Sequence, residues 1–317
     1  MTHAPNITAA GKQSRPPLWQ TLLAFATIYL VWGSTFLAIR IGVHEVPPVL
    51  LAAIRFLVAG GAMVGWLLAR GVAAPTAREW RSAFLLALPL FLLNYGLLFW
   101  AETRITSGVT AVMQATIPAF TTLSEIIILG SQRLSWRLAG GLALGLIGVA
   151  VLTSDSLGLG TAAVDRISAA ALLVASIGWA VGSVLTRKLR LPASQAMSSG
   201  AQMLAGGLWL AVAAIVLGEG RGFDPRTVSP HAWLALLYLI VAGSIAAFTA
   251  YLWLIHHVSP TRVSTYAYVN PVVAVLLGYF AAGEPLSVRT LAGAPCILLS
   301  VLVISTMRRS PATVTRR

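Results

Sequence analysis

Two prolines, Pro118 and Pro271, interrupt long apolar stretches and lie 153 residues apart. A proline inside a helix removes one backbone hydrogen bond and clashes with the preceding turn, so a carbonyl is freed to face a solute or an ion. For a single proline, a packing kink is the simpler role, because such kinks are common in membrane helices. A matched pair near mid-membrane instead points to the binding site of a transporter. The spacing therefore predicts two equivalent helix interruptions beside a solute site.

A polar stripe accompanies the first proline along the predicted helix 107–129. Its members are spaced four, four, three and four residues apart, which places them within about 80° of one face at ~100° per residue. Such groups are costly to expose to lipid, so we expect the stripe to line the bundle interior or a wet cavity. Hydrogen bonding between helices is the alternative role. The stripe consists of Thr110, Gln114, Pro118, Thr121 and Glu125.

The second copy of this stretch carries its polar groups at other positions. Tyr266, Tyr268 and Asn270 precede the second proline, whereas the residues equivalent to the stripe are apolar or small. Two tryptophans near mid-depth could stack on a solute or fill the core. This unequal polarity suits a cavity that binds an asymmetric organic solute. The predicted solute site comprises Trp32, Asn94, Gln114, Pro118, Trp179, Tyr266, Tyr268, Asn270 and Pro271.

Two charged residues fall within predicted spans, and each has alternative roles. Arg55 could bind a substrate carboxylate, extend to the membrane surface, or pair with Glu45 or Glu102. Glu125 is the candidate proton carrier if transport is proton-coupled, because a desolvated carboxyl takes up a proton near neutral pH. A salt bridge between Glu125 and a cytoplasmic arginine is the alternative.

These residues must be positioned by elements that cross a lipid bilayer. The chain has 317 residues, of which 57% are hydrophobic and 10% charged, whereas about a quarter of a soluble domain is charged. Apolar stretches of about 17–25 residues cross the membrane as helices, because helices satisfy their own backbone polar groups. We predict an all-α integral membrane protein with ten such helices, at residues 18–41, 47–69, 80–101, 107–129, 137–153, 168–187, 194–216, 231–254, 261–281 and 289–307.

The basic residues indicate how the chain is oriented. A net charge of +13 could suggest nucleic-acid binding, but the distribution of the charge favours another explanation. With the N-terminus inside, fifteen lysines and arginines fall in inner segments and six in outer segments. This bias predicts a multi-pass protein with both termini in the cytoplasm and no nucleic-acid partner. The acidic residues lean outward, and Glu45 and Glu102 are assigned to outer segments.

The two halves of the sequence repeat each other. Each half has five predicted helices, so the second copy enters the membrane in the opposite direction, as in inverted-repeat transporters. The predicted organisation is a cytoplasmic tail at 1–17, a first repeat at 18–155, a second repeat at 166–307 and a cytoplasmic tail at 308–317. At an offset of 147 residues the matches pair Trp32 with Trp179, Arg40 with Arg187, Leu57 with Leu204 and Gly60 with Gly207. Close helix approach is predicted at the glycine pairs Gly61/Gly65, Gly141/Gly145 and Gly178/Gly182.

Several segments resemble a known family. The segment from Val31 to Phe36 (Val-Trp-Gly-Ser-Thr-Phe), followed by Arg40 and by Ile54 to Leu57 (Ile-Arg-Phe-Leu), looks like the opening of an EamA domain. The segment from Ser176 to Ser183 (Ser-Ile-Gly-Trp-Ala-Val-Gly-Ser) resembles the opening of a second copy. The family's most recognisable segment is similar to the run from Thr265 to Val273 (Thr-Tyr-Ala-Tyr-Val-Asn-Pro-Val-Val), ending with Gly283 to Ser287 (Gly-Glu-Pro-Leu-Ser).

Over roughly residues 20–307, the chain thus resembles the EamA-domain family of the drug/metabolite transporter superfamily, close to its YedA-like group. The resemblance implies ten helices, a place in the bacterial inner membrane and secondary transport, commonly export of amino acids or other metabolites. One departure is that the Gly-Glu of the second copy is Gly130-Ser131 in the first. Any role of that glutamate is therefore confined to the second copy.

Other function classes have weaker support. The only lysines are Lys12 and Lys188, so the chain has no phosphate-binding Gly-Lys loop and is not expected to use ATP by itself. The alternative function, a membrane enzyme or lipid-handling protein, would need paired acids, histidines or a metal set within the spans. The single Cys296 excludes an internal disulfide. We expect no cofactor and no metal. The expected partners are the bilayer and a small solute; protons or an exchange solute, and a homodimer, stay open.

Overall fold

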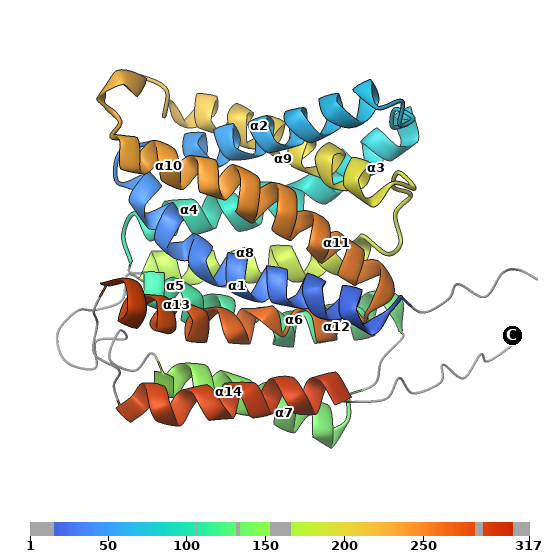
Figure 1. Cartoon of the computed structure of the whole chain (residues 1–317), viewed down its shortest axis with the longest axis vertical. Helices are drawn as coiled ribbons and strands as arrows, with labels where there is room; N and C mark the ends of the chain where they lie inside the picture. The colour runs from blue at the N-terminus through green and yellow to red at the C-terminus, as the bar shows by residue number, and fades with distance from the viewer. Residues whose placement is uncertain (1–15, 106, 131–133, 153–165, 283–287, 307–317) are drawn as a thin grey trace, which may run out of the picture.

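The computed structural model describes residues 16–105, 107–130, 134–152, 166–282 and 288–306, and every regular element in these ranges is a helix (Figure 1). Six helical runs among them are long and apolar enough to cross a membrane: Leu18–Val43, Pro48–Ala69, Ala77–Glu102, Ile167–Leu185, Gln195–Leu217 and Pro230–His257. Ile117–Leu129 and Trp136–Gly148 are shorter apolar helices. The expectation of an all-helical membrane protein is confirmed, whereas the number of ten spans stays a prediction.

The helices follow one order in the two halves of the chain. The first half contains α1 (Leu18–Val43), α2 (Pro48–Ala69), α3 (Ala77–Ala87), the π-helix η1 (Leu88–Gly96), α4 (Leu97–Glu102), α5 (Ser107–Gln114), α6 (Ile117–Ser124), the π-helix η2 (Glu125–Leu129) and α7 (Trp136–Leu152). The second contains α8 (Arg166–Leu185), α9 (Gln195–Leu217), the short 3-10 helix η3 (Pro225–Thr227), α10 (Pro230–Tyr238), the π-helix η4 (Leu239–Ala246), α11 (Ala247–His257), α12 (Pro260–Val263), α13 (Tyr266–Ala282) and α14 (Val288–Thr306).

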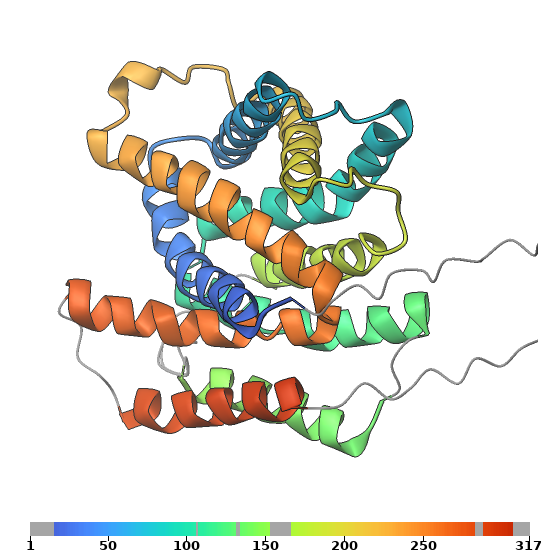
Figure 2. The ribbon, with the colours of Figure 1, turned by 45° about the vertical axis from the view of Figure 1, so that its right-hand side comes forward.

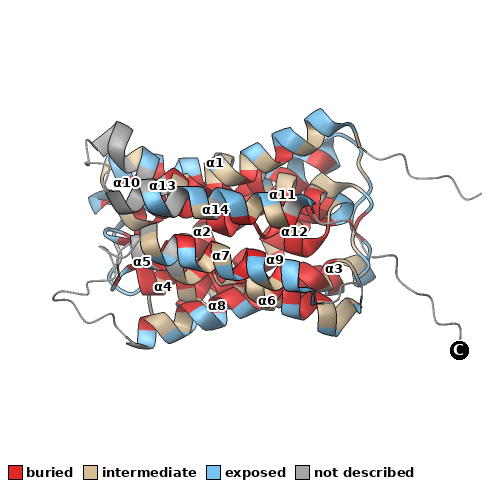
Figure 3. Ribbon diagram, turned by 90° about the horizontal axis from the view of Figure 1, so that it is seen from below, coloured by how far each residue is buried: buried red, intermediate tan, exposed pale blue. Residues whose placement is uncertain are grey.

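The outer surface of the bundle is apolar. Figure 3 shows buried residues on the faces that the helices turn toward one another and exposed residues on the outside. Large apolar side chains are among those exposed, for example Ile127, Ile215 and Val216, at 71%, 76% and 80%. A surface of this kind is covered by lipid in a membrane protein, because water would make it an aggregation hazard.

Equivalent helices of the two halves pack as pairs. In Figures 1 and 2, α2 and α9 lie side by side at one end of the molecule, and α7 and α14 at the other. Between these pairs, α1 packs on α13, and α8 packs on α6. The contact of α1 with α13 and that of α8 with α6 are therefore repeat counterparts of each other.

Two repeat-related glycines bring α2 and α9 into backbone contact. A Cβ atom on Gly60 would lie 2.4 Å from the backbone nitrogen of Leu204, and one on Gly207 would lie 2.6 Å from that of Leu57. Gly60 matches Gly207 and Leu57 matches Leu204 at the same offset of 147 residues. The contact is therefore reciprocal, as expected for two copies related by a twofold axis that passes between these helices. We call it the glycine seam.

Two repeat-related arginines secure equivalent helix ends. The Nη1 atom of Arg40 donates to the backbone carbonyls of Glu102 and Ile105, at 3.1 and 2.9 Å. Arg187 donates from Nε to the carbonyl of Ile255 at 2.8 Å, and from Nη2 to that of Val258 at 2.5 Å. These carbonyls lie at the ends of α4 and α11, where they lack helical partners, and a cation there also complements the helix dipole.

The expectation of two equivalent breaks at the prolines is wrong. Pro118 does follow a break, because α5 ends at Gln114 and α6 starts at Ile117. Pro271, however, lies inside α13, which is continuous around it. A proline in the first turn of a helix loses no hydrogen bond, so α6 carries Pro118 as its second residue without cost.

In the second half the break lies before α13, at residues 264–265. The hydroxyls of Ser264 and Thr265 bond back to the carbonyls of Thr261 and Arg262, at 2.8 and 2.7 Å. Such side-chain bonds compete with the helical ladder.

Candidate functional site

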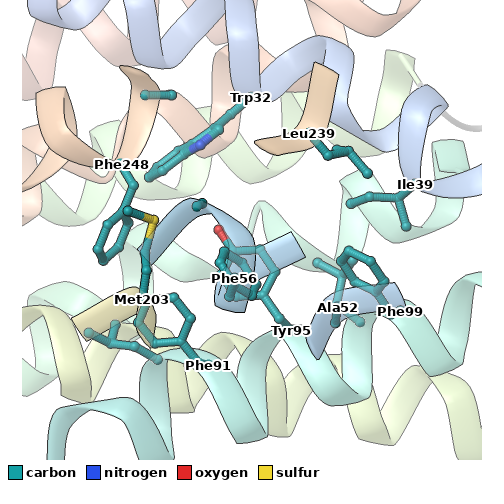
Figure 4. Close-up of a cluster of buried hydrophobic side chains, with 14 of the residues drawn as sticks. Trp32, Ile39, Ala52, Phe56, Phe91, Tyr95, Phe99, Met203, Leu239 and Phe248 are labelled. Carbon is teal, nitrogen blue, oxygen red and sulfur yellow. The ribbon is translucent and has the colours of Figure 1, made fainter. Parts of the chain in front are cut away.

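Aromatic side chains from both halves meet at the centre of the bundle. The indole rings of Trp32 on α1 and Trp179 on α8 touch edge to face, with centroids 5.4 Å apart. Trp32 also contacts Tyr251 at 5.1 Å and Tyr266 at 4.7 Å. Figure 4 shows Trp32 within this buried cluster, together with Tyr95. Because the two tryptophans are repeat equivalents, the cluster lies where the two copies meet.

A small cavity of about 50 Å³ lies beside these rings. Pockets that hold small organic ligands usually have about 300–1,000 Å³, so an organic solute does not fit in the conformation described. The structure therefore represents a closed form of the site. The cavity is lined by Trp32, Thr35, Phe36, Ile39, Asn94, Tyr95, Leu98, Gln114, Ile117, Trp179, Tyr266 and Asn270.

Three amides contribute polar groups to the cavity. Asn94 donates from Nδ2 to the carbonyl of Ala175 at 3.0 Å, and Gln114 accepts at Oε1 from the Ser176 hydroxyl at 2.7 Å. Both amides are therefore positioned by α8. The Oδ1 atom of Asn270 is buried and, within the described part of the chain, accepts no hydrogen bond. An acceptor left in this state is available to a donor group of a ligand.

One π-helix lines the cavity, and a second π-helix contacts a residue of its wall. The π-helix η1 carries Asn94 and Tyr95, and η4, at nearly the same place in the second half, carries Gly243 and Ser244. Short π-helical segments inside α-helices often mark functional sites, because they realign side chains and loosen the backbone ladder. Here the indole nitrogen of Trp32 donates to the carbonyl of Gly243 at 3.0 Å.

A model of the EamA-like transporter family matches the chain twice, over residues 19–154 and 166–306. The chain belongs to this family. It is 40% identical over 273 residues to YedA of Escherichia coli (strain K12), described as an uncharacterized inner membrane transporter, a match that covers 86% of this chain and 85% of the relative. It is also 28% identical over 303 residues to a probable amino-acid metabolite efflux pump of Salmonella typhimurium, with 87% and 91% covered.

A solved structure titled "Crystal structure of protein" has the same fold, with a TM-score of 0.71. The two chains are 23% identical, and the match covers 92% of this chain and 96% of the other.

The structure of this EamA-family chain brings most of the predicted site residues together. Trp32, Asn94, Gln114, Trp179, Tyr266 and Asn270 line the cavity. Pro118, Tyr268 and Pro271 are buried but are not among the residues of the cavity wall. All five residues of the polar stripe are buried, as expected for a face turned to the bundle interior.

Tyr268 belongs to a different part of the core. Its hydroxyl donates to the carbonyl of Leu142 on α7 at 3.1 Å, and its ring fills the space that a Cβ on Gly145 would need. Residues two apart on a helix point about 200° away from each other, so Tyr266 and Tyr268 do not face the same cavity. This helical spacing was the signal that could have separated them.

Glu125 is engaged at the far end of α6. It is 2% exposed, and its Oε2 accepts from both the backbone nitrogen and the hydroxyl of Thr261, at 3.1 and 2.8 Å. The carboxylate thus joins η2 to the first turn of α12. Its assignment as a proton carrier stays a prediction.

Glu102 is buried, and the side of the membrane on which it lies stays a prediction. Glu102 is the last residue of α4 and is 0% exposed. Its repeat equivalent, 153 residues later, is Ile255, which is also fully buried. The repeat register was therefore the signal that this position belongs to the core.

Arg55 does not pair with either of the carboxylates considered for it. Glu45 instead accepts two hydrogen bonds from Ser229, at 2.6 and 2.7 Å, which tie the α1–α2 loop to the start of α10. These bonds lower the pKa of the Glu45 carboxyl below its ordinary value. Both carboxylate oxygens of Glu102 have no hydrogen-bond partner among the described residues. Arg55 itself is buried and donates to Ser244.

A larger groove of about 450 Å³ lies on the outside, between α1, α9 and α11. It is lined by Trp19, Leu23, Ala250 and Trp253, among others. It lies away from the polar stripe and from the paired tryptophans. We therefore take the smaller central cavity as the candidate site.

Proposed function

We propose that this chain is a secondary transporter that moves a small organic metabolite, an amino acid or a similar compound, across the bacterial inner membrane by alternating access. The observation that carries the proposal is the position of the central cavity. It lies where Trp32 of the first copy touches Trp179 of the second, and it is lined by amides as well as aromatic rings. A cavity at the interface of two repeats is the usual place for a transported solute.

The proposed architecture is ten membrane-spanning helices in two inverted repeats, with both termini in the cytoplasm. The reciprocal contacts of Gly60 with Leu204 and of Gly207 with Leu57 support it. So do the matched bonds of Arg40 and Arg187 to the ends of α4 and α11. Inverted copies exchange roles between the inward-open and outward-open forms, so equivalent contacts at both ends are expected.

The proposed cycle starts from the closed form. Rocking of the copies separates Trp32 from Trp179 and enlarges the cavity toward one side of the membrane. An aromatic pair contributes about 0.5–1.5 kcal/mol beyond the area it buries. A solute that stacks between the separated rings replaces this contribution. Its polar groups would then bind the amides of Gln114 and Asn270.

Export is the proposed direction, and an amino acid or related metabolite the proposed solute class. The similarity to the Salmonella relative, a probable amino-acid metabolite efflux pump, supports both parts. Coupling to protons or to an exchange solute is tested by the same reconstituted system, with and without a pH gradient.

The test is counterflow in proteoliposomes. Vesicles loaded with one unlabelled amino acid or metabolite are diluted into the same compound carrying a radiolabel, and accumulation is followed across a panel. We expect accumulation of at least one solute, with Gln114→Ala and Asn270→Ala each reducing the rate. Gln20→Ala, in the outer groove, is the matched control and should retain it. No accumulation of any solute by folded, reconstituted protein would refute the proposal.

A further inference from the structure

A guanidinium group is buried next to the central cavity without a carboxylate partner in the described structure. Arg55 on α2 is 1% exposed. Its Nε donates to the hydroxyl of Ser244 at 2.8 Å, and its Nη1 has no hydrogen-bond partner in the described part of the chain. A buried charge is costly unless it is paired and its donors are satisfied. The closed form therefore holds a cation with unused binding capacity.

The surroundings of this group connect it to the cavity wall. The guanidinium carbon lies 4.7 Å from the ring centroid of Phe56 and 5.2 Å from that of Tyr95. A Cβ on Gly243 would lie 2.9 Å from Nη2 of Arg55 and 3.0 Å from Cγ2 of Thr35. Thr35 and Tyr95 both line the cavity. Arg55 therefore lies one layer of side chains behind its wall.

The aromatic rings account for only part of the stabilisation that the charge needs. Contacts between a cation and a ring are weaker than a pair of charge-assisted hydrogen bonds to a carboxylate. The rings leave the edge of the guanidinium group, with its N–H donors, to other partners. The planar fork of arginine matches both oxygens of a carboxylate, which the point charge of lysine does not.

We propose that Arg55 is the binding group for a carboxylate of the transported solute, reached when Thr35 and Tyr95 move aside as the cavity opens. This inference rests on the proposed transport function and narrows its substrate class to organic carboxylates. The absence of a side chain on Gly243 lets the guanidinium group pack against the backbone of η4, because a Cβ there would lie only 2.9 Å from Nη2. The hydroxyl of Ser244 holds the group in place from the π-helix η4.

The experiment compares solutes that differ only in the carboxylate. Phenylalanine and phenylalaninamide, and 3-phenylpropionate and its amide, are assayed by counterflow and by thermal shift of the detergent-solubilised protein. The variants are Arg55→Gln, which removes the charge, and Arg55→Lys, which keeps it without the fork. Arg70→Gln, at the end of the same helix, is the matched control, because Arg70 is exposed and stacks on Trp66.

We expect the wild type to prefer each acid over its amide by about tenfold to a hundredfold, since a hydrogen bond to a charged group is worth about one to two powers of ten in binding. Arg55→Gln should abolish this preference, Arg55→Lys should retain part of it, and Arg70→Gln should retain all of it. Arg55→Gln should still bind or move the amide, which shows that the variant is folded.

Two outcomes overturn the inference and leave the transport function intact. In the first, the wild type moves acid and amide equally well. In the second, Arg55→Gln keeps the full preference for the acid. Failure of the transport function looks different, because no panel solute of any charge then accumulates. If thermal shifts with chloride or phosphate equal those with 3-phenylpropionate and also depend on Arg55, the site takes inorganic anions and the solute assignment is wrong.

Discussion

The glycine seam between α2 and α9 allows a sharp test of the packing, through Gly60→Ala. The new Cβ would lie 2.4 Å from the backbone nitrogen of Leu204, whereas ordinary van der Waals contact begins at 3.4 Å. Backbone atoms cannot change rotamer, so the two helices must separate by about 1 Å, and overpacking of this kind costs about 1–3 kcal/mol.

The adjacent Gly61 provides an internal control, because a Cβ there meets nothing within 4 Å. Gly61→Ala changes helix propensity by the same amount as Gly60→Ala, a gain of about 0.8–1.0 kcal/mol, without any clash. The difference between the two variants therefore isolates the contact between the helices. A shift of about 2–4 °C per kcal/mol places Gly60→Ala about 5 °C below Gly61→Ala in the midpoint of thermal unfolding.

The assay is thermal unfolding of the purified proteins in one detergent, followed by tryptophan fluorescence, with counterflow as the functional readout. The double variant Gly60→Ala/Gly207→Ala should lose less stability than the sum of the single variants, because one separation of the helices relieves both clashes. Equal midpoints for Gly60→Ala and Gly61→Ala, or strict additivity in the double variant, would show that the seam is not a contact shared by the two copies.

Three further outcomes are expected. Arg187→Met should lower the unfolding midpoint more than Arg190→Met does, because the former loses two charged hydrogen bonds worth about 1.5–3 kcal/mol each and the latter is exposed. Hydrogen bonds from Ser229 lower the pKa of the Glu45 carboxyl, so the ionised carboxylate stabilises the fold. This stabilisation is complete at pH values above the ordinary carboxyl pKa, and it is lost as the pH falls through the lowered pKa. The difference in midpoint between wild type and Glu45→Gln should therefore be present at neutral pH and vanish in acid, and a constant difference would contradict it. Glu102→Leu should raise the midpoint, because it removes a buried carboxyl that has no hydrogen-bond partner among the described residues. A lower midpoint would show that attraction to Arg40, which donates to the backbone carbonyl of Glu102, outweighs the cost of burial.

The course of the helices could be predicted from the sequence because apolar length alone determines what crosses a bilayer. The predicted spans agree with the described helices to within a few residues where no break intervenes, as for Pro48–Ala69 and Gln195–Leu217. The central contact of Trp32 with Trp179 was also predictable in part, since the repeat register had already paired them.

Packing partners were harder to predict, because spacing shows that glycines share a face but not what that face meets. Gly178 and Gly182 do lie close to another helix, where a Cβ would meet Pro89 and Leu90 at 2.8 and 2.5 Å. Gly61 and Gly65 have the same spacing and face open space. Which of two adjacent glycines makes the contact depends on the rotation of the helix, and only the folded bundle determines it.

The polar residues of the site were also predictable only in part. Residues on one stripe, such as Gln114, were predicted to face inward and do. The position of Arg55 behind Thr35 and Tyr95 was not predictable, because it depends on the π-helix η4 and on the small size of Gly243. A local change of helix type is a response to tertiary packing and leaves little trace in apolar periodicity.

The contact between Trp32 and Trp179 has an optical consequence. Two indole rings with centroids 5.4 Å apart and planes at 83° are close enough for their electronic transitions to couple. Such coupling produces a paired positive and negative band in circular dichroism, which an isolated indole lacks. Since one ring belongs to each copy, movement of the copies changes the signal directly. The protein has 10 tryptophans, and this pair is an intrinsic, label-free reporter of whether the central site is closed.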